Sequence, residues 1–171
     1  MKLKLNREYA ARHLFVTFIM LALSCWFGFD AVVRYPATDA KVLYVSIEGA
    51  EPPANFDLES FKAQKTKTQY GFSLATLVVA LVVGLRLLSA WRLDFAFDDD
   101  SFSYNGRRFA YGDMKNLTLT RWKKLGILAF SVTINGVNHR IVLDSWHHEG
   151  VKDFFAQLQK SSSLPLTQVG Q

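Results

Sequence analysis

The hydrophobic residues of this chain gather in two long runs. The first, residues 14–33, reads LFVTFIMLALSCWFGFDAVV, and the second, residues 72–90, reads FSLATLVVALVVGLRLLSA. Twenty helical residues cover about 30 Å, the thickness of the hydrocarbon core of a bilayer. Tyr70 and Trp91 bracket the second run, where interfacial aromatic residues belong. We therefore predict two transmembrane helices, over residues 14–33 and 70–91; a pair of buried core helices is the alternative.

Residues 1–25 allow another interpretation, a secretory signal. Basic residues precede a hydrophobic stretch, and residues 22–25 (ALSC) loosely resemble a lipoprotein cleavage site. However, the residue three positions before Cys25 is Ala22 rather than a large aliphatic residue, and apolar residues continue past Cys25. The pattern therefore favours a membrane span over a cleaved signal.

The segment between the two runs, residues 34–69, is too long for a tight hairpin and too short for a domain. Within it, KVLYVSIE (residues 41–48) alternates like a β-strand, and Pro52 and Pro53 break any regular element. Asp57 is then placed to cap a helix leading into the second span. We expect a loop that either contacts a neighbouring membrane protein or serves as a spacer.

From residue 92 the hydrophobic period changes to two, which predicts β-strands. Asn105-Gly106 is the strongest hairpin signal in the chain, and Asn135-Gly136 separates a second pair of strands. About six antiparallel strands are predicted, over residues 92–97, 102–104, 107–111, 114–122, 127–134 and 137–143.

After the last strand the spacing of apolar residues becomes helical. Val151, Phe154 and Leu158 share one face of a predicted helix over residues 146–160, with Asp144 or Ser145 as a plausible cap. A tail follows over residues 161–171, which we expect to be flexible. The soluble part is thus a small antiparallel β domain, closed by a C-terminal helix.

This order of elements resembles a bacterial pleckstrin-homology-like domain, of the kind attached to short transmembrane hairpins. The resemblance covers residues 92–160 and rests on FAFDDDSFSYNGRRFAYGDMKNLTL, the strand pair ILAFSVTINGVNHRIVLD and the helix HHEGVKDFFAQLQK. It implies a binding or scaffolding module without catalytic residues. Some eukaryotic relatives bind phosphoinositides through basic residues around the first hairpin. Here Asp98, Asp99 and Asp100 form that turn and would repel a phosphate.

Charge decides the expected orientation. The net charge is +5, and the excess sits mainly in a basic N-terminal segment, residues 1–13. This spread is too thin for nucleic-acid binding, which needs a dense basic face. Because basic residues mark the cytoplasmic ends of membrane spans, and Arg92 follows the second span, we expect both termini in the cytoplasm and residues 34–69 outside.

Basic residues of the β domain are candidates for contact with anionic lipid headgroups or a partner. The alternative is solvated charge that discourages aggregation at strand edges. The candidates are Arg107, Arg108, Arg121, Lys123 and Lys124.

The spans contain further candidates for partner contact. Asp30 and Arg86 lie near the ends of their spans, at levels too different for them to pair; each either reaches its own interface or pairs with a partner's helix. Small residues four apart permit close helix packing, either within the hairpin or with a partner. These pairs are Ala80 with Gly84, Gly71 with Ala75, and Ser24 with Gly28; Phe18 is a further candidate contact.

The sequence offers little catalytic chemistry. It contains no Gly-rich phosphate loop, nucleophile motif or HExxH. His147 and His148 are adjacent and would point about 100° apart on a helix, and His139 is the only other histidine near them in sequence. Cys25 is the only cysteine, which excludes a disulfide within the chain. We therefore predict no enzyme activity, no metal site and no cofactor.

Together these features predict a membrane α-helical hairpin that carries a pleckstrin-homology-like domain in the bacterial inner membrane. The predicted function is an accessory or scaffold subunit that binds other integral membrane proteins. The alternative is a membrane-anchored module that binds anionic lipid headgroups.

Overall fold

The computed structural model describes residues 1–118 and 121–161. It divides into two compact units, which are described separately. The hairpin unit comprises residues 13–86. The β unit combines residues 1–12 with the chain from residue 87 onward. The predicted flexible tail lies outside the described residues, apart from Ser161.

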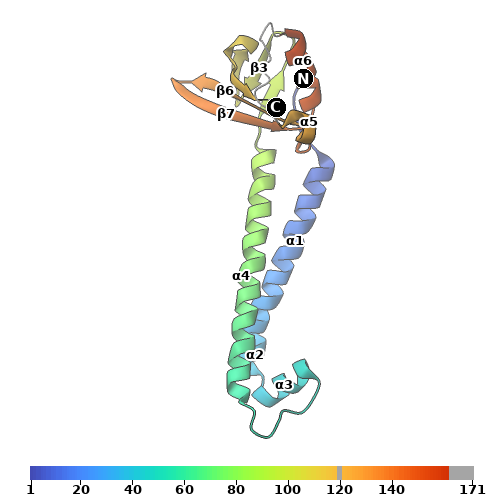
Figure 1. Cartoon of the computed structure of the whole chain (residues 1–171), viewed down its shortest axis with the longest axis vertical. Coiled ribbons are helices and arrows are strands. Elements are labelled where there is room, and N and C mark those ends of the chain that lie inside the picture. Colours follow the sequence, from blue (N-terminus) through green and yellow to red (C-terminus); the bar gives the residue numbers. More distant parts are fainter. Residues whose placement is uncertain (119–120, 162–171) are drawn as a thin grey trace. The chain divides into compact units, whose positions relative to one another are not determined.

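Two long helices dominate the hairpin unit (Figure 1). Helix α1 (Arg7–Phe29) continues through a π-helical segment, Asp30–Arg34, into α2 (Tyr35–Ala37). Helix α4 spans Leu58–Trp91. Among the described residues, these are the helices long and apolar enough to cross a membrane. Only 17% and 11% of their most apolar stretches are buried, whereas core helices are mostly buried.

The predicted helix after Asp57 is confirmed and is continuous with α4. The Asp57 side chain accepts hydrogen bonds from the backbone N–H of Ser60 (3.0 Å) and from its hydroxyl (2.7 Å). These bonds supply partners that the first turn of a helix lacks. They also hold the pKa of the Asp57 carboxyl below its usual range, the backbone bond from Ser60 contributing most.

The prediction of a strand over residues 41–48 is wrong, because this segment forms helix α3 (Ala40–Glu48). The Asp39 side chain caps the helix by accepting from the N–H groups of Lys41 (2.9 Å) and Val42 (3.3 Å). Gly49, with φ of 72°, ends it in the left-handed conformation. These local end signals outweigh the strand-like alternation of the segment.

Contacts with α4 give the connecting segment a defined structure. Tyr44 of α3 packs against Phe56 and Phe61, with ring centroids 4.8 and 4.9 Å away. Lys62 donates to the carbonyl oxygens of Pro36 (3.0 Å) and Thr38 (2.7 Å). The segment between the two long helices is therefore folded against the start of α4.

Two three-stranded antiparallel sheets form most of the β unit. The first contains β2 (Phe95–Phe97), β3 (Ser101–Tyr104) and β4 (Arg107–Ala110) in that order, and a 3-10 turn follows at Tyr111–Asp113. The second contains β5 (Lys115–Thr118), β6 (Ile127–Ile134) and β7 (Val137–Asp144). The predicted antiparallel β domain is confirmed.

The two predicted Asn-Gly turns are confirmed. Asn105 and Gly106 have φ angles of 49° and 74°, and Asn135 and Gly136 have 51° and 78°. Two successive positive φ angles define the turn that matches the twist of paired strands. This geometry sets the registers of β3 with β4 and of β6 with β7.

The predicted strand over residues 114–122 is only partly correct. β5 spans Lys115–Thr118, its register shifts between these two residues, and Asn116 between them has φ of 53°. Residues 119–120 of the predicted strand lie outside the described residues. A short helix, α5 (Trp122–Leu125), begins within the end of the predicted strand and is capped by Gly126 with φ of 67°. The positive φ at Asn116 interrupts the pleat, which the period-two pattern does not reveal.

The N-terminal segment is part of the β unit, which the sequence did not indicate. The N–H of Leu3 donates to the Phe95 carbonyl (3.0 Å), and the N–H of Phe97 donates to the Met1 carbonyl (2.7 Å). β1 (Lys4–Leu5) then pairs antiparallel with β8 (His148–Glu149). Residues 1–5 thus extend the β2 edge of the first sheet and pair with a strand near the C-terminus.

The predicted start of the C-terminal helix at residue 146 is also wrong, because α6 spans Val151–Ser161. Asp144 instead accepts from the N–H of Trp146 (2.8 Å), and its carbonyl accepts from His147 (3.1 Å). This turn leads into β8, and Gly150 with φ of 91° separates β8 from α6. An Asp side chain serves a turn as well as it serves a helix cap.

Aromatic side chains fill the core of the β unit. Phe95, Phe102 and Phe130 come from the sheets and are at most 1% exposed. Helix α6 adds Phe154, fully buried, whose ring centroid lies 4.9 Å from that of Phe95. The predicted apolar face of the helix, including Val151 and Leu158, is confirmed as the closing layer of the core.

Candidate functional site

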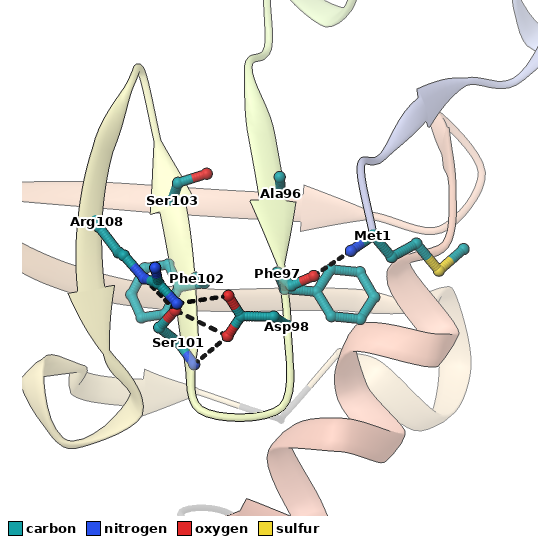
Figure 2. A pocket seen from close by; sticks show the side chains of 8 residues that line it. All are labelled: Met1, Ala96, Phe97, Asp98, Ser101, Phe102, Ser103 and Arg108. Atoms are coloured by element: carbon teal, nitrogen blue, oxygen red, sulfur yellow. Dashed lines mark hydrogen bonds and ion pairs between the residues drawn. The ribbon is translucent and has the colours of Figure 1, made fainter.

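The β2–β3 turn borders an open pocket of about 260 Å³ (Figure 2). Figure 2 shows the Asp98 carboxylate facing Arg108 and Ser101. The backbone nitrogen of Met1 donates to the carbonyl of Phe97 beside it. The lining residues are Met1, Ala96, Phe97, Asp98, Ser101, Phe102, Ser103 and Arg108.

The two charged side chains of this pocket, Asp98 and Arg108, form an ion pair with each other. Asp98 accepts from the Ser101 hydroxyl (2.8 Å) and the Ser101 backbone N–H (2.8 Å), and its second oxygen lies 2.7 Å from Nη2 of Arg108. The Ser101 hydroxyl holds the pKa of Asp98 below its usual range, and the Arg108 guanidinium adds to this effect. The Asp98 carboxylate is therefore ionised at neutral pH, paired with Arg108 and bonded within its own turn.

Tyr111 stabilises the same turn through a hydrogen bond from its buried side chain. Its side chain is 5% exposed, and its hydroxyl donates to the carbonyl oxygen of Asp98 over 2.6 Å. Burial, and then the charges of Asp98, Asp99 and Asp100, raise the pKa of Tyr111 to about 12. The phenol therefore stays protonated and keeps this hydrogen bond at physiological pH.

The structure separates the predicted basic candidates into two groups. Arg107 and Arg108 lie on β4, where Arg107 donates to the side chain of Asn135 (3.0 Å) at the tip of the β6–β7 hairpin. Arg121 and Lys124 lie at α5, before the other end of β6; both are exposed, and the side chain of Lys123 lies outside the described residues. β6 is eight residues long, so about 24 Å separate its two ends.

A second cluster lies within the β unit, which includes the start of α1 and the end of α4. Tyr9 of α1 is 1% exposed and packs with Leu87 and Ala90 of α4. Its ring lies 4.3 Å from that of His147 and 5.1 Å from that of Trp146, measured between centroids. These residues are far apart in the sequence and carry no shared motif, so sequence reasoning did not link them.

His148 completes this cluster. It is 6% exposed, and its Nε2 lies 2.8 Å from the Ala90 carbonyl oxygen in the last turn of α4. The His147 ring lies 6.3 Å from the His148 ring between centroids. Within residues 1–118 and 121–161, no three His, Cys, Asp or Glu side chains are grouped to hold a metal ion.

The small residues of the spans face the other helix of the same hairpin in two of the three predicted pairs. Ala80 is 2% exposed, and a Cβ added at Gly84 would lie 3.6 Å from Thr17. The hydroxyl of Ser24 donates to the carbonyl of Ser73 and that of Ser73 to the carbonyl of Ser24, each over 2.9 Å. These contacts make close packing within the hairpin.

The remaining candidates in the hairpin unit differ in their surroundings. Asp30 is 5% exposed and pairs with Arg34 of the same helix over 3.4 Å. Phe18 is 70% exposed, and Arg86 is exposed as well. A Cβ added at Gly71 would meet no atom within 4 Å. Phe18, Gly71 and Arg86 are thus open to lipid or to a partner.

The resemblance of residues 92–160 to pleckstrin-homology-like domains stays a prediction. Two antiparallel sheets and a closing helix occur in the expected order. No protein-family model, curated protein or solved structure matches this chain.

Proposed function

We propose that this chain is a non-enzymatic accessory or scaffold subunit of a larger assembly in the bacterial inner membrane. In this proposal α1 and α4 cross the bilayer, and the β unit is a pleckstrin-homology-like binding module at the cytoplasmic surface. Anionic lipid is a second ligand of the same module.

The observation that carries the proposal is the shortness of both connections to the β unit. Helix α4 ends at Trp91 and β2 begins at Phe95, so three residues, about 10 Å of extended chain, separate them. On the other side a single residue, Asn6, separates β1 from α1. A β unit attached at two points with so little slack must stay at the membrane surface if the helices cross the bilayer.

A module attached so closely to the membrane can bind a partner only near the membrane surface. This favours a resident partner in the same membrane over a soluble one. The exposed side chains of the spans, among them Phe18, provide surface for such a partner within the bilayer. In the β unit, no described strand pairs with the outer edge of β7, where Val137 and Val142 are 59% and 50% exposed. Strand edges of this kind accept a strand from another chain.

The test has two stages, both on the full chain in native membranes. Alkaline carbonate washing first separates integral from peripheral proteins, and we expect the chain to stay with the lipid. Extraction in mild detergent then recovers the tagged chain, and we expect one integral membrane protein in fixed stoichiometry. A chain that is released by carbonate contradicts the anchor, and one that is extracted alone contradicts the accessory role.

Matched variants identify which unit binds the partner. Val137→Asp with Val142→Asp changes two exposed positions of β7 that are not among the buried core residues. Phe18→Ala changes the exposed face of α1. If only the double variant at Val137 and Val142 loses the partner, the contact is on the β unit. If only Phe18→Ala loses it, the contact is within the membrane.

A further inference from the structure

Three large apolar side chains are exposed close to the ends of the long helices. Trp91 at the end of α4 is 69% exposed, Leu125 of α5 is 58% exposed, and Trp146 after β7 is 48% exposed. The core of the β unit leaves these side chains out, although Trp and Leu are costly to expose to water. Exposed apolar side chains that lie together indicate contact with an apolar or interfacial environment outside the chain.

Contacts within the β unit bring the three side chains to one region. The N–H of Ser145 donates to the carbonyl of Gly126 over 3.0 Å, which joins the end of β7 to α5. The next residue, Trp146, packs edge-on against Tyr9 at the start of α1. His148 then contacts the last turn of α4 at Ala90. Residues 144–148 thus connect α5 with the ends of both helices.

Basic residues adjoin members of this apolar group in the sequence. Arg92, Arg121 and Lys124 are exposed and lie within one to four residues of Trp91 or Leu125. We call Trp91, Arg92, Arg121, Lys124, Leu125 and Trp146 the helix-end patch.

The acidic residues nearby already have partners or basic neighbours. Asp144 accepts from the N–H of Trp146, and its other oxygen lies 3.6 Å from Nε2 of His147. Glu149 lies opposite Lys4 in the β1–β8 pair. The helix-end patch therefore presents apolar and positively charged groups together.

We propose that the helix-end patch contacts the headgroup layer of the bilayer that anchors the chain, with a preference for anionic lipids. The proposal rests on the membrane anchoring proposed above. Trp side chains favour the interface between lipid and water, and Lys and Arg are attracted to the negative surface of the cytoplasmic leaflet. Trp91 of the patch is the last residue of α4 and Arg92 follows it, so the lipid nearest to the patch is the bilayer that α4 is proposed to cross.

This assignment selects between the two basic groups. Arg121 and Lys124 belong to the helix-end patch, whereas Arg107 lies at the opposite end of β6, about 24 Å away. Arg108 is already paired with Asp98. Lipid contact through α5 and none through β4 is the expected pattern.

The test compares three positions of similar exposure, each carrying a single cysteine in a Cys25→Ser background. Leu125 lies in the patch, Val137 lies at the tip of the β6–β7 hairpin and Leu81 lies in α4; they are 58%, 59% and 54% exposed. The full chain is spin-labelled and placed in lipid nanodiscs of phosphatidylcholine with phosphatidylglycerol. Collision rates with oxygen, which concentrates in lipid, are compared with those of a water-soluble nickel chelate.

We expect the oxygen-to-nickel ratio to be highest at residue 81 and lowest, at the value typical of water, at residue 137. At residue 125 we expect a ratio several-fold above the value in water. Equal ratios at 125 and 137, with a lipid value at 81, overturn the helix-end patch while the anchor stands. An aqueous value at 81 overturns the anchor itself. The two failures are thus distinguishable.

Charge reversal tests the lipid preference. Arg121→Glu with Lys124→Glu should bring the ratio at residue 125 close to that at 137. The matched control, Arg107→Glu with Arg140→Glu, alters two exposed residues of β4 and β7. It should leave the oxygen-to-nickel ratio at residue 125 unchanged. For the protein without charge reversal, nanodiscs of phosphatidylcholine alone should lower the oxygen-to-nickel ratio at residue 125. A ratio that responds to neither charge reversal nor lipid composition overturns the anionic preference.

Discussion

Nε2 of His148 lies 2.8 Å from the carbonyl oxygen of Ala90, across 58 residues of sequence. Because a carbonyl oxygen only accepts hydrogen bonds, Nε2 must carry a proton. The last carbonyl groups of a helix lack partners within the helix, and that of Ala90 receives only a longer bond from the Leu93 N–H, 3.4 Å. The buried imidazole therefore joins β8 directly to the end of α4.

Replacing His148 with Ala should destabilise the β unit by about 1–3 kcal/mol, the usual cost of leaving a buried polar group without its partner. Denaturant unfolding of the full chain in detergent, followed by tryptophan fluorescence, measures the change. The control is His139→Ala, an exposed histidine of β7, which should stay within about 0.5 kcal/mol of the unchanged protein. Equal effects of the two substitutions would mean that the bond to Ala90 contributes nothing to stability.

Leu3→Ala should destabilise the β unit by about 2–5 kcal/mol, as expected for truncating a buried aliphatic side chain. Leu3 is 4% exposed and belongs to the same core as Phe95 and Phe154. Limited proteolysis of the full chain should show faster cleavage after residue 92. Lys4→Ala, at an exposed position of β1, is the control. Unaltered proteolysis of the Leu3 variant would show that residues 1–5 are dispensable to the β unit.

The parts of the fold that were predictable are those encoded by neighbouring residues. The β6–β7 hairpin follows from Asn135-Gly136 between two apolar strands, and the inward face of α6 follows from Val151, Phe154 and Leu158. Helix α3 carried its own signal in Asp39 before it and Gly49 after it. These end signals predict the helix better than the period-two alternation between them predicts a strand.

The parts that were not predictable depend on residues far apart in the chain. β1 and β8 have two residues each, too few for any periodic pattern, and they pair across more than 140 positions. The helix-end patch has the same origin, since Trp91, Leu125 and Trp146 come from three separate segments. Only the closure of the β unit brings such residues together.

Gly28→Leu should push the two helices of the hairpin unit apart. A Cβ at Gly28 would lie 3.2 Å from the Ser73 hydroxyl oxygen, closer than an ordinary van der Waals contact, and a leucine adds further atoms beyond that Cβ. The reporter is disulfide formation between cysteines that replace Phe27 and Phe72, whose ring centroids are 5.5 Å apart, in a Cys25→Ser background. We expect cross-linking to slow several-fold.

Gly71→Leu is the matched control for this experiment, because it also adjoins a reporter position but has open space around its Cβ. Cross-linking should proceed as in the parent. If both substitutions slow it equally, the effect comes from local disturbance of the reporter and not from helix packing at Gly28.

Tyr111→Phe should change how the stability of the β unit depends on alkaline pH. The pKa of Tyr111 rises from 10.0 to about 12 in the folded chain, chiefly through burial. The folded state thus holds the phenolic proton more tightly than the unfolded state. This stabilisation is complete below pH 10 and is lost as the pH rises through about 12. Urea unfolding between pH 9 and 12 should show a steeper loss of stability for the parent than for Tyr111→Phe.

At neutral pH the same variant should lose about 0.5–1.5 kcal/mol, because the hydrogen bond from the hydroxyl to the Asp98 carbonyl is removed. Tyr104→Phe removes a tyrosine hydroxyl from β3 and leaves that bond in place, so it should follow the parent at every pH. A Tyr111→Phe protein that loses stability as steeply as the parent would assign the alkaline transition to other groups. The buried phenol would then support the β2–β3 turn through its hydrogen bond alone.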